Sequence, residues 1–221
     1  MKKNYSLVLG IVSLFLATSM NGQAFRKGSL LVSISEGHTK AMYNTNDISD
    51  GNPKPIKHKC VDGVRDPIII EYGVSNKWSL SLTSGNDIFT LNPNDYYNFR
   101  NSGNKIDAKT NEVTFDVSYH VFVSKKLDVS VFSGAGAFSV GFSGVDNGDN
   151  WYKYQSNGTM VRVGTRARYY FWKRLGAFGM VSSYNARSST KDIKTNTVGN
   201  NISTNINGFA VEMGLCYRIF N

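Results

Sequence analysis

The chain has 221 residues, of which 41% are hydrophobic and 13% aromatic, and its formal net charge is +9. This length suits a short leader followed by one domain. Two cysteines are too few for a disulfide framework, and three scattered histidines give no zinc-binding spacing. Glycine is plentiful and proline scarce, with 21 and 4 residues, which is typical of a β-rich protein with irregular loops.

The first residues have the features of a secretory signal peptide. Lys2 and Lys3 form a positive start, and the apolar run over 7–17 is shorter than the roughly 20 residues that span a bilayer. Small residues then allow cleavage after Ala24, and cleavage after Gly22 is nearly as favourable. A retained membrane anchor is the alternative, and the short apolar run argues against it. We therefore predict that the leader is removed on export.

The mature domain, expected over 25–221 after a leader over 1–24, contains eight stretches that predict β-strands. Each alternates apolar and polar residues and ends at turn residues. In chain order they cover about 28–36, 67–74, 78–84, 111–123, 127–142, 160–171, 175–186 and 207–220. The fifth contains Gly134-Ala135-Gly136-Ala137, where a bulge would reverse its two faces. The facing of the seventh stretch stays open.

Short and long connections alternate strictly between these stretches. The short ones cover 75–77, 124–126 and 172–174, and the long ones cover about 37–66, 85–110, 143–159 and 187–206. Membrane β-barrels have this asymmetry, with short periplasmic turns and longer external loops. A soluble exported barrel or sandwich is the main alternative, but its fold does not require short and long connections to alternate.

The two faces of the predicted strands differ sharply in charge. One face is almost uncharged, as contact with hydrocarbon requires, because a mid-bilayer Arg or Lys costs roughly 2–4 kcal/mol. The other face carries both signs among small residues, which indicates a narrow polar lumen. We expect a buried ionic network there, made by Glu71, Asp116, Arg162, Arg166, Arg168, Glu212 and Arg218. The fold class is therefore all-β, an eight-stranded antiparallel transmembrane β-barrel.

The same arrangement places aromatic residues and cysteines along the barrel. We expect a periplasmic aromatic girdle of Tyr72, Trp78, Tyr169, Phe171, Trp172, Tyr217 and Phe220, and an outer group of Phe142, Trp151, Tyr152 and Tyr154. Cys60 and Cys216 fall near opposite membrane faces, which predicts two free thiols.

Three segments resemble the family of small outer-membrane β-barrel proteins related to the OmpA transmembrane domain and to OmpW-like porins. The stretches 67–80 and 167–176 resemble the family's hairpins. The last residues, 214–221, resemble the signal read by the outer-membrane assembly machinery, with Gly214, Tyr217, Ile219 and Phe220 as its key positions and Asn221 as a departure. The resemblance also implies an inward acidic residue where this chain has Met180.

The sequence favours a non-enzymatic integral protein of the Gram-negative outer membrane, without a cofactor. Envelope integrity, surface interaction or slow passage of small solutes are the expected roles. Its basic charge suits lipopolysaccharide phosphates and outer-membrane lipid, not nucleic acid, and we expect a monomer that also engages the assembly machinery.

Two other functions stay open at this point. An OmpW-like conduit for small hydrophobic molecules would need an apolar upper lumen, whereas the predicted lumen is charged. A lipid-A-modifying barrel enzyme would need a catalytic group such as Ser118, His120 and Asp116. Those residues share one strand face, but alternate residues on a strand lie roughly 6.5–7 Å apart, beyond hydrogen-bond reach.

Overall fold

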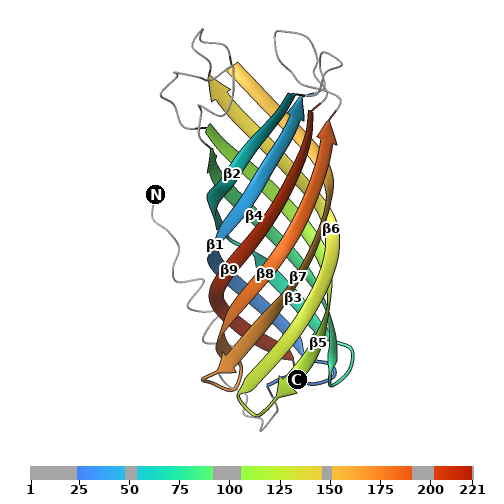
Figure 1. The fold of residues 1–221 in the computed structure, drawn as a ribbon. Helices are drawn as coiled ribbons and strands as arrows, with labels where there is room; N and C mark the ends of the chain where they lie inside the picture. The colour runs from blue at the N-terminus through green and yellow to red at the C-terminus, as the bar shows by residue number, and fades with distance from the viewer. Residues whose placement is uncertain (1–23, 48–53, 92–105, 146–150, 191–201, 221) are drawn as a thin grey trace.

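The computed structural model describes residues 24–47, 54–91, 106–145, 151–190 and 202–220. Within these ranges nine strands form one antiparallel sheet: β1 (Leu30–Asp47), β2 (Lys54–Arg65), β3 (Ile68–Gly73), β4 (Trp78–Leu91), β5 (Ile106–Val123), β6 (Leu127–Val145), β7 (Trp151–Tyr170), β8 (Leu175–Thr190) and β9 (Ile202–Phe220). β9 pairs with β1 along all of β1, so the sheet closes into a barrel (Figure 1). No helix in these ranges is long and apolar enough to cross a membrane.

The nine segments make an eight-stranded barrel because β2 and β3 share one position in it. β1 pairs with β3 in its first part and with β2 further along, and both also pair with β4. The break falls at Asp66-Pro67, where proline has no N–H to give to the ladder. The amide of Ser35 donates to the Pro67 carbonyl oxygen at 3.1 Å, which continues the pairing across the break. The predicted eight-stranded antiparallel barrel is confirmed.

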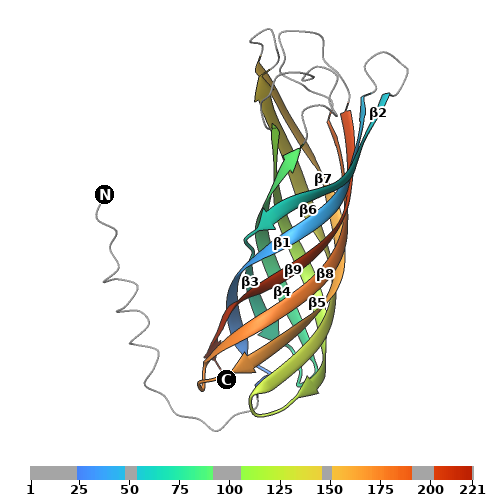
Figure 2. The same ribbon diagram turned by 60° about the vertical axis from the view of Figure 1, so that its left-hand side comes forward.

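The two ends of the barrel differ, as predicted. The turns 74–77, 124–126 and 171–174 all join strands at one end, which we call the lower end. The strands wrap obliquely around the barrel axis and run on well beyond the predicted stretches toward the upper end (Figure 2). The expected long loop over 37–66 is therefore wrong: β1 continues to Asp47 and β2 begins at Lys54.

The upper parts of these strands escaped prediction because their outward residues are mostly polar. Lys40 and Asp62 face each other across β1 and β2, both exposed, with Nζ and Oδ1 3.6 Å apart. Water can solvate such residues, so the apolar–polar alternation ends while backbone pairing continues. Alternation therefore reports the apolar part of a strand and not its full length.

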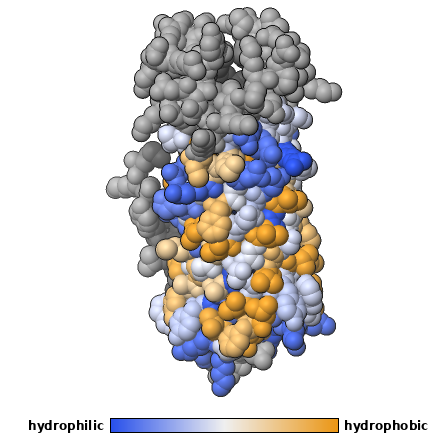
Figure 3. Space-filling model, in the orientation of Figure 1, coloured by the Kyte–Doolittle hydropathy of each residue, from blue (hydrophilic) through white to orange (hydrophobic). Residues whose placement is uncertain are grey.

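The outer surface of the barrel is apolar, and its interior holds buried charged residues beside clusters of hydrophobic ones, unlike a soluble barrel. On β7, Val161 and Val163 are 54% and 56% exposed, whereas Arg162 and Arg166 are 2% and 0% exposed. Each barrel position contributes an exposed apolar residue to a ring that we call the apolar belt: Ile34, Ile70, Leu82, Phe115, Val131, Val163, Val181 and Val211. On the face drawn in Figure 3, hydrophobic side chains gather over the middle and lower barrel, with hydrophilic residues above them and at the lower rim.

The question of a bulge at Gly134-Ala135-Gly136-Ala137, which the sequence left open, is settled: β6 pairs with β7 without a register shift from Leu127 to Val145. The shift between β5 and β6 lies instead on β5, between His120 and Phe122. The glycines serve close approach: a Cβ on Gly134 would lie 1.9 Å from Asp116 Oδ1. The open facing of the seventh stretch is also settled, since Met180 and Tyr184 of β8 are buried.

The lower rim carries exposed aromatic side chains. Those of Tyr72, Trp78, Tyr169, Phe171, Trp172 and Phe220 are exposed there, while Tyr217 is half-buried. Phe142, Trp151, Tyr152 and Tyr154 lie on β6 and β7, but their side chains fall outside the described ones. Both cysteines are free, as predicted: Cys60 is exposed on β2, and Cys216 is buried on β9.

Candidate functional site

The charged side chains inside the barrel form two clusters, one above the other. The upper cluster comprises Arg65, Asp87, Glu112, Asp116, Arg162 and Glu212. The lower cluster comprises Glu71, His120, Asp128, Arg166 and Arg168. No member of either cluster is more than 4% exposed. Period-two alternation places them there, since every second residue of a strand points to the same side.

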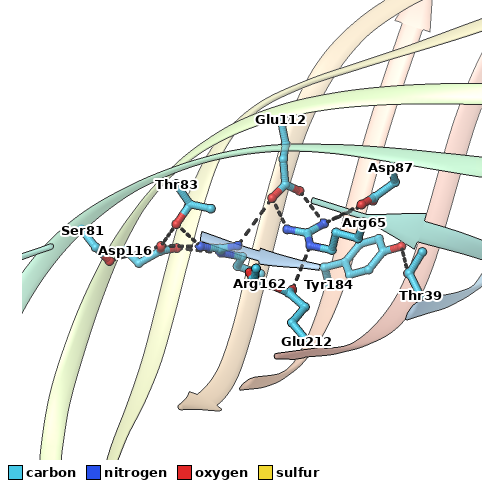
Figure 4. A network of polar contacts seen from close by, with 11 residues as sticks. Thr39, Arg65, Ser81, Thr83, Asp87, Glu112, Asp116, Arg162, Tyr184 and Glu212 are labelled. Atoms are coloured by element: carbon cyan, nitrogen blue, oxygen red, sulfur yellow. Dashed lines mark hydrogen bonds and ion pairs between the residues drawn. The ribbon is translucent and has the colours of Figure 1, made fainter. Parts of the chain in front are cut away.

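Arg65 is the centre of the upper cluster (Figure 4). Its Nε donates to Glu212 Oε1 at 2.9 Å, and its Nη1 donates to Asp87 at 3.2 Å and to Glu112 at 3.1 Å. These three carboxylates come from β9, β4 and β5, so one guanidinium ties together strands on different sides of the barrel.

Arg162 extends the upper cluster across the lumen. Its Nε donates to Asp116 Oδ1 at 2.8 Å, and its Nη1 lies 3.5 Å from Glu112 Oε1. Glu112 therefore links the two guanidinium groups (Figure 4). Beside them the hydroxyls of Tyr184 and Thr39 share a hydrogen bond of 2.8 Å.

Glu71 is the centre of the lower cluster. Its carboxylate accepts from Arg166 Nη1 at 2.6 Å, from the Ser79 hydroxyl at 2.8 Å, and from Arg168. His120 lies between two carboxylates, with Nε2 3.3 Å from Glu71 Oε1 and Nδ1 2.6 Å from Asp128 Oδ1. Arg168 Nη1 also donates to Asp128, at 2.8 Å.

Charge is distributed unevenly along the lumen. The upper cluster has four carboxylates for two guanidinium groups, whereas the lower cluster has two carboxylates for two guanidinium groups and an imidazole. Buried charges are tolerated only when they are paired and hydrogen-bonded. The lumen is therefore closed by groups that bind each other, with an excess of acid above and of base below.

Comparison with known proteins finds no match by sequence: no protein-family model and no curated protein matches the chain. Solved structures do match. OprG from Pseudomonas aeruginosa has a TM-score of 0.57 at 13% identity, covering 92% of this chain and 100% of its own. AlkL, studied in DMPC lipid bilayers, also has 0.57 at 13% identity, covering 92% of this chain and 96% of its own. The chain has the fold of the small outer-membrane β-barrels.

A third solved structure similar to this barrel is the outer membrane protease OmpT from Escherichia coli, with a TM-score of 0.47 and 11% identity over 92% of this chain and 100% of that one. At such identities the likeness establishes the architecture of the barrel alone. Its role has to be argued from its own residues.

The barrel brings together most of the charged residues selected from the sequence. Asp116, Arg162 and Glu212 lie in the upper cluster, and Glu71, Arg166 and Arg168 lie in the lower one. Arg218 lies apart from both, near the lower mouth. It donates to the Ala24 carbonyl oxygen at 3.3 Å and to that of Lys173, and its Cζ lies 4.9 Å from the centre of the Tyr170 ring.

Sequence reasoning missed Arg65, Asp87, Glu112 and Asp128 as network members. Arg65 and Asp87 fell in expected loops of the barrel, while Glu112 and Asp128 stood near the ends of predicted strands. The sequence did contain a signal for two of them. Arg65 lies an even number of residues from Glu71, and Glu112 an even number from Asp116, which places each pair on the same side of the alternating pattern. Continuing the alternation beyond the apolar residues would have placed them in the lumen.

The considered group Ser118, His120 and Asp116 does not form in the barrel. Asp116 binds Arg162, while His120 contacts residues of the two neighbouring strands: Ser79 of β4, with Oγ 3.0 Å from Nε2, and Asp128 of β6. No group of three or more His, Cys, Asp or Glu in the described part of the chain is arranged to hold a metal ion.

The residues of the predicted assembly signal lie on β9, at the seam where the barrel closes. Gly214 pairs with Ser35 of β1, and a Cβ on Gly214 would lie 2.0 Å from the Ile34 carbonyl oxygen. Tyr217 and Ile219 are half-buried, and Phe220 is exposed. Asn221 lies outside the described residues. The close contact at Gly214 explains why a glycine stands in this strand.

Met180 stands where the family resemblance implied an acidic residue, and it faces Arg166 across β7 and β8. Arg166 donates to Glu71 through Nη1, but its buried Nε and Nη2 have no hydrogen-bond partner. The Phe132 ring lies 5.2 Å from its Cζ and supplies a cation–π contact instead. The lower cluster therefore has fewer acceptors than its buried donors need.

We expect Met180→Glu to raise the free energy of unfolding by roughly 1–3 kcal/mol, because it supplies a partner to a buried charged donor. Urea unfolding in phospholipid vesicles measures this. Met180→Leu is the matched control and should change little, since it adds no acceptor. A loss of stability in Met180→Glu would mean that burying the new carboxylate outweighs its pairing with Arg166.

Proposed function

We propose that this chain is an integral protein of the Gram-negative outer membrane whose barrel is a closed anchor for the strand ends and loops that it presents outside the cell. The apolar belt supports membrane insertion, since it surrounds the barrel while the charges lie inside. The observation that carries the closed lumen is Arg65, which binds carboxylates from three strands at 1% exposure.

The packing of the lumen favours an anchor over an open pore. Eight strands leave an interior that side chains just fill. Phe132 lies between the clusters, with Arg162 and Arg166 at 5.4 and 5.2 Å from its ring. A solute would have to separate buried ion pairs, which costs several kcal/mol for each charge left alone. Slow passage of small solutes is therefore the most that this lumen allows.

The partners of this anchor follow from its outer surface. Above the apolar belt, Lys40, Lys109 and Arg187 are exposed, and they suit the phosphates of lipopolysaccharide. β9 offers the assembly machinery an edge that later closes on β1. A conduit for small hydrophobic molecules would find buried apolar residues such as Tyr43, Phe89 and Ile206 in the upper lumen. It is disfavoured because the ion pairs of the upper cluster close the lumen below them.

Conductance across planar bilayers tests the closed lumen, with the wild-type protein and Glu71→Ala recorded side by side. We expect no stepwise conductance from either, because the upper cluster closes the lumen independently of Glu71. Channels in the wild type would contradict the anchor. Channels in Glu71→Ala alone would show that the lower cluster is a gate. Outer-membrane fractionation with heat-modifiable gel migration tests the location.

A serine hydrolase is the second candidate function, because Ser79, His120 and Asp128 have the connectivity of a Ser–His–Asp triad. Against it, Glu71 accepts the Ser79 hydroxyl and also faces His120 Nε2, so the ring has carboxylates at both nitrogens. A fluorophosphonate probe separates the two functions. We expect no labelling, whereas labelling that disappears in Ser79→Ala would establish a nucleophile and overturn the anchor role.

A further inference from the structure

The segment that precedes β1 enters the lower mouth of the barrel instead of leaving it. Ala24 and Phe25 are both 0% exposed, and they belong to the same buried cluster as Leu31, Tyr170 and Cys216. Residues next to a cleavage site become the end of the mature chain, and chain ends are usually exposed. The burial of Phe25 therefore indicates that the barrel binds it. Both predicted cleavage positions leave Phe25 on the mature chain, and cleavage after Gly22 leaves Ala24 as well.

A turn directs this segment back into the mouth. The Ser29 amide donates to the Arg26 carbonyl oxygen at 3.1 Å, and Gly28 has a φ of 82°, which glycine adopts without strain. The Gly28 amide then donates to the Gly73 carbonyl oxygen at 2.7 Å, and the Gly73 amide to that of Ser29 at 2.8 Å. The turn is thus fixed to the end of β3.

The other end of the segment is fixed on the far side of the mouth. The Ala24 amide donates to the carbonyl oxygen of Ser124, in the turn between β5 and β6, at 2.8 Å. The Ala24 carbonyl oxygen accepts from Arg218 of β9 at 3.3 Å. Between these anchors the Phe25 ring stacks on His120, with the ring centres 3.4 Å apart and the planes at 10°.

We propose that residues 25–29, joined by Ala24 when the leader is cleaved after Gly22, form an N-terminal plug that closes the periplasmic mouth and shields the lower cluster from water. The plug crosses the mouth from β3 to the turn between β5 and β6, and Phe25 covers the imidazole that Glu71 and Asp128 hold. The plug lies below both charge clusters. It therefore closes the lower mouth independently of whether the upper cluster lets solutes pass.

The chain carries its own reporter for this plug. It has two cysteines, of which Cys60 is exposed and Cys216 is 1% exposed beside the plug. A small maleimide added to the folded mature protein should modify Cys60 alone in the wild type. In Phe25→Ala we expect Cys216 to react roughly tenfold faster or more, because the mouth opens locally while the barrel stays folded. Mass spectrometry of the labelled protein counts and locates the adducts.

Phe122→Ala is the matched control, since it removes an exposed phenylalanine from the same lower part of the barrel. It should leave Cys216 protected. Gly28→Ala is a second opening variant: its added Cβ meets nothing within 4 Å, so only the left-handed backbone of the turn is penalised. Heat-modifiable gel migration checks that each variant is folded. The test is read from Phe25→Ala and Gly28→Ala, whichever of them is folded by this criterion.

Protection of Cys216 in folded Phe25→Ala and Gly28→Ala, or its labelling in the wild type at the rate of Cys60, would overturn the plug. Labelling of Cys216 tests the plug, and conductance tests the closed lumen of the proposed function. Because neither measurement depends on the other, one of the two proposals can fail while the other holds.

Discussion

Replacement of Arg65 by alanine is expected to lower the free energy of unfolding by roughly 3–5 kcal/mol, because it leaves buried carboxylates without their shared partner. Asp87 and Glu212 receive hydrogen bonds from Arg65, and Glu112 would keep only its longer contact with Arg162. The removal would leave like charges facing one another across a narrow lumen. Urea unfolding in phospholipid vesicles, followed by tryptophan fluorescence, measures the loss.

Lys40→Ala is the matched control for Arg65→Ala. It also removes a cation from an ion pair on the upper barrel, but the side chains of Lys40 and Asp62 are 70% and 76% exposed. Exposed pairs contribute about 0–1 kcal/mol, so little should change. Equal effects of the two substitutions would mean that the upper cluster does not stabilise the barrel.

Glu71→Ala should lower the free energy of unfolding by a similar amount, roughly 3–5 kcal/mol, for the opposite reason. Its loss leaves two guanidinium groups and an imidazole with Asp128 as their remaining carboxylate in the lower cluster. Arg166 is affected most, since its hydrogen bond to Glu71 is the one that it makes in the cluster. The same vesicle unfolding measurement applies.

Glu36→Ala is suited as the comparison for Glu71→Ala, because Glu36 is an exposed glutamate on β1. We expect a change within about 0.5 kcal/mol, as for most surface substitutions. The double variant Glu71→Ala with Arg166→Met adds a further check. It should recover part of the loss, because it also removes the cation that was left without its partner. No recovery would show that the lower cluster acts through shape and not through charge pairing.

The strands within the apolar belt could be predicted because every second residue there is apolar and faces outward. Along β7 the outward residues from 161 to 169 are apolar or small, and Arg162, Arg166 and Arg168 point inward as expected. Above the belt no such pattern exists. β1 there exposes His38 and Lys40 to water, so its continuation to Asp47 was not predictable from alternation.

The pairing of charges across the lumen could not be predicted either. Which inward residues meet depends on the register of neighbouring strands and on the tilt of the barrel, and neither is encoded in one strand. His120 illustrates this, since its partners Ser79 and Asp128 come from β4 and β6 and not from its own strand. The N-terminal plug was not predicted, because the leader was expected to end at Gly22 or Ala24 and the residues just after it had no predicted structure.

The break at Asp66-Pro67 has a consequence for how such a barrel can change over evolution. Below the break, β3 carries part of the apolar belt, so in the proposed membrane location substitutions there have to keep the outward residues apolar. Above it, β2 and the facing part of β1 meet water outside, and lengthening a solvated loop costs only about 0.6 kcal/mol for each doubling. In the proposed outer-membrane location, the part of the barrel above the break can therefore be lengthened or exchanged, while the part below it keeps the apolar belt in the membrane.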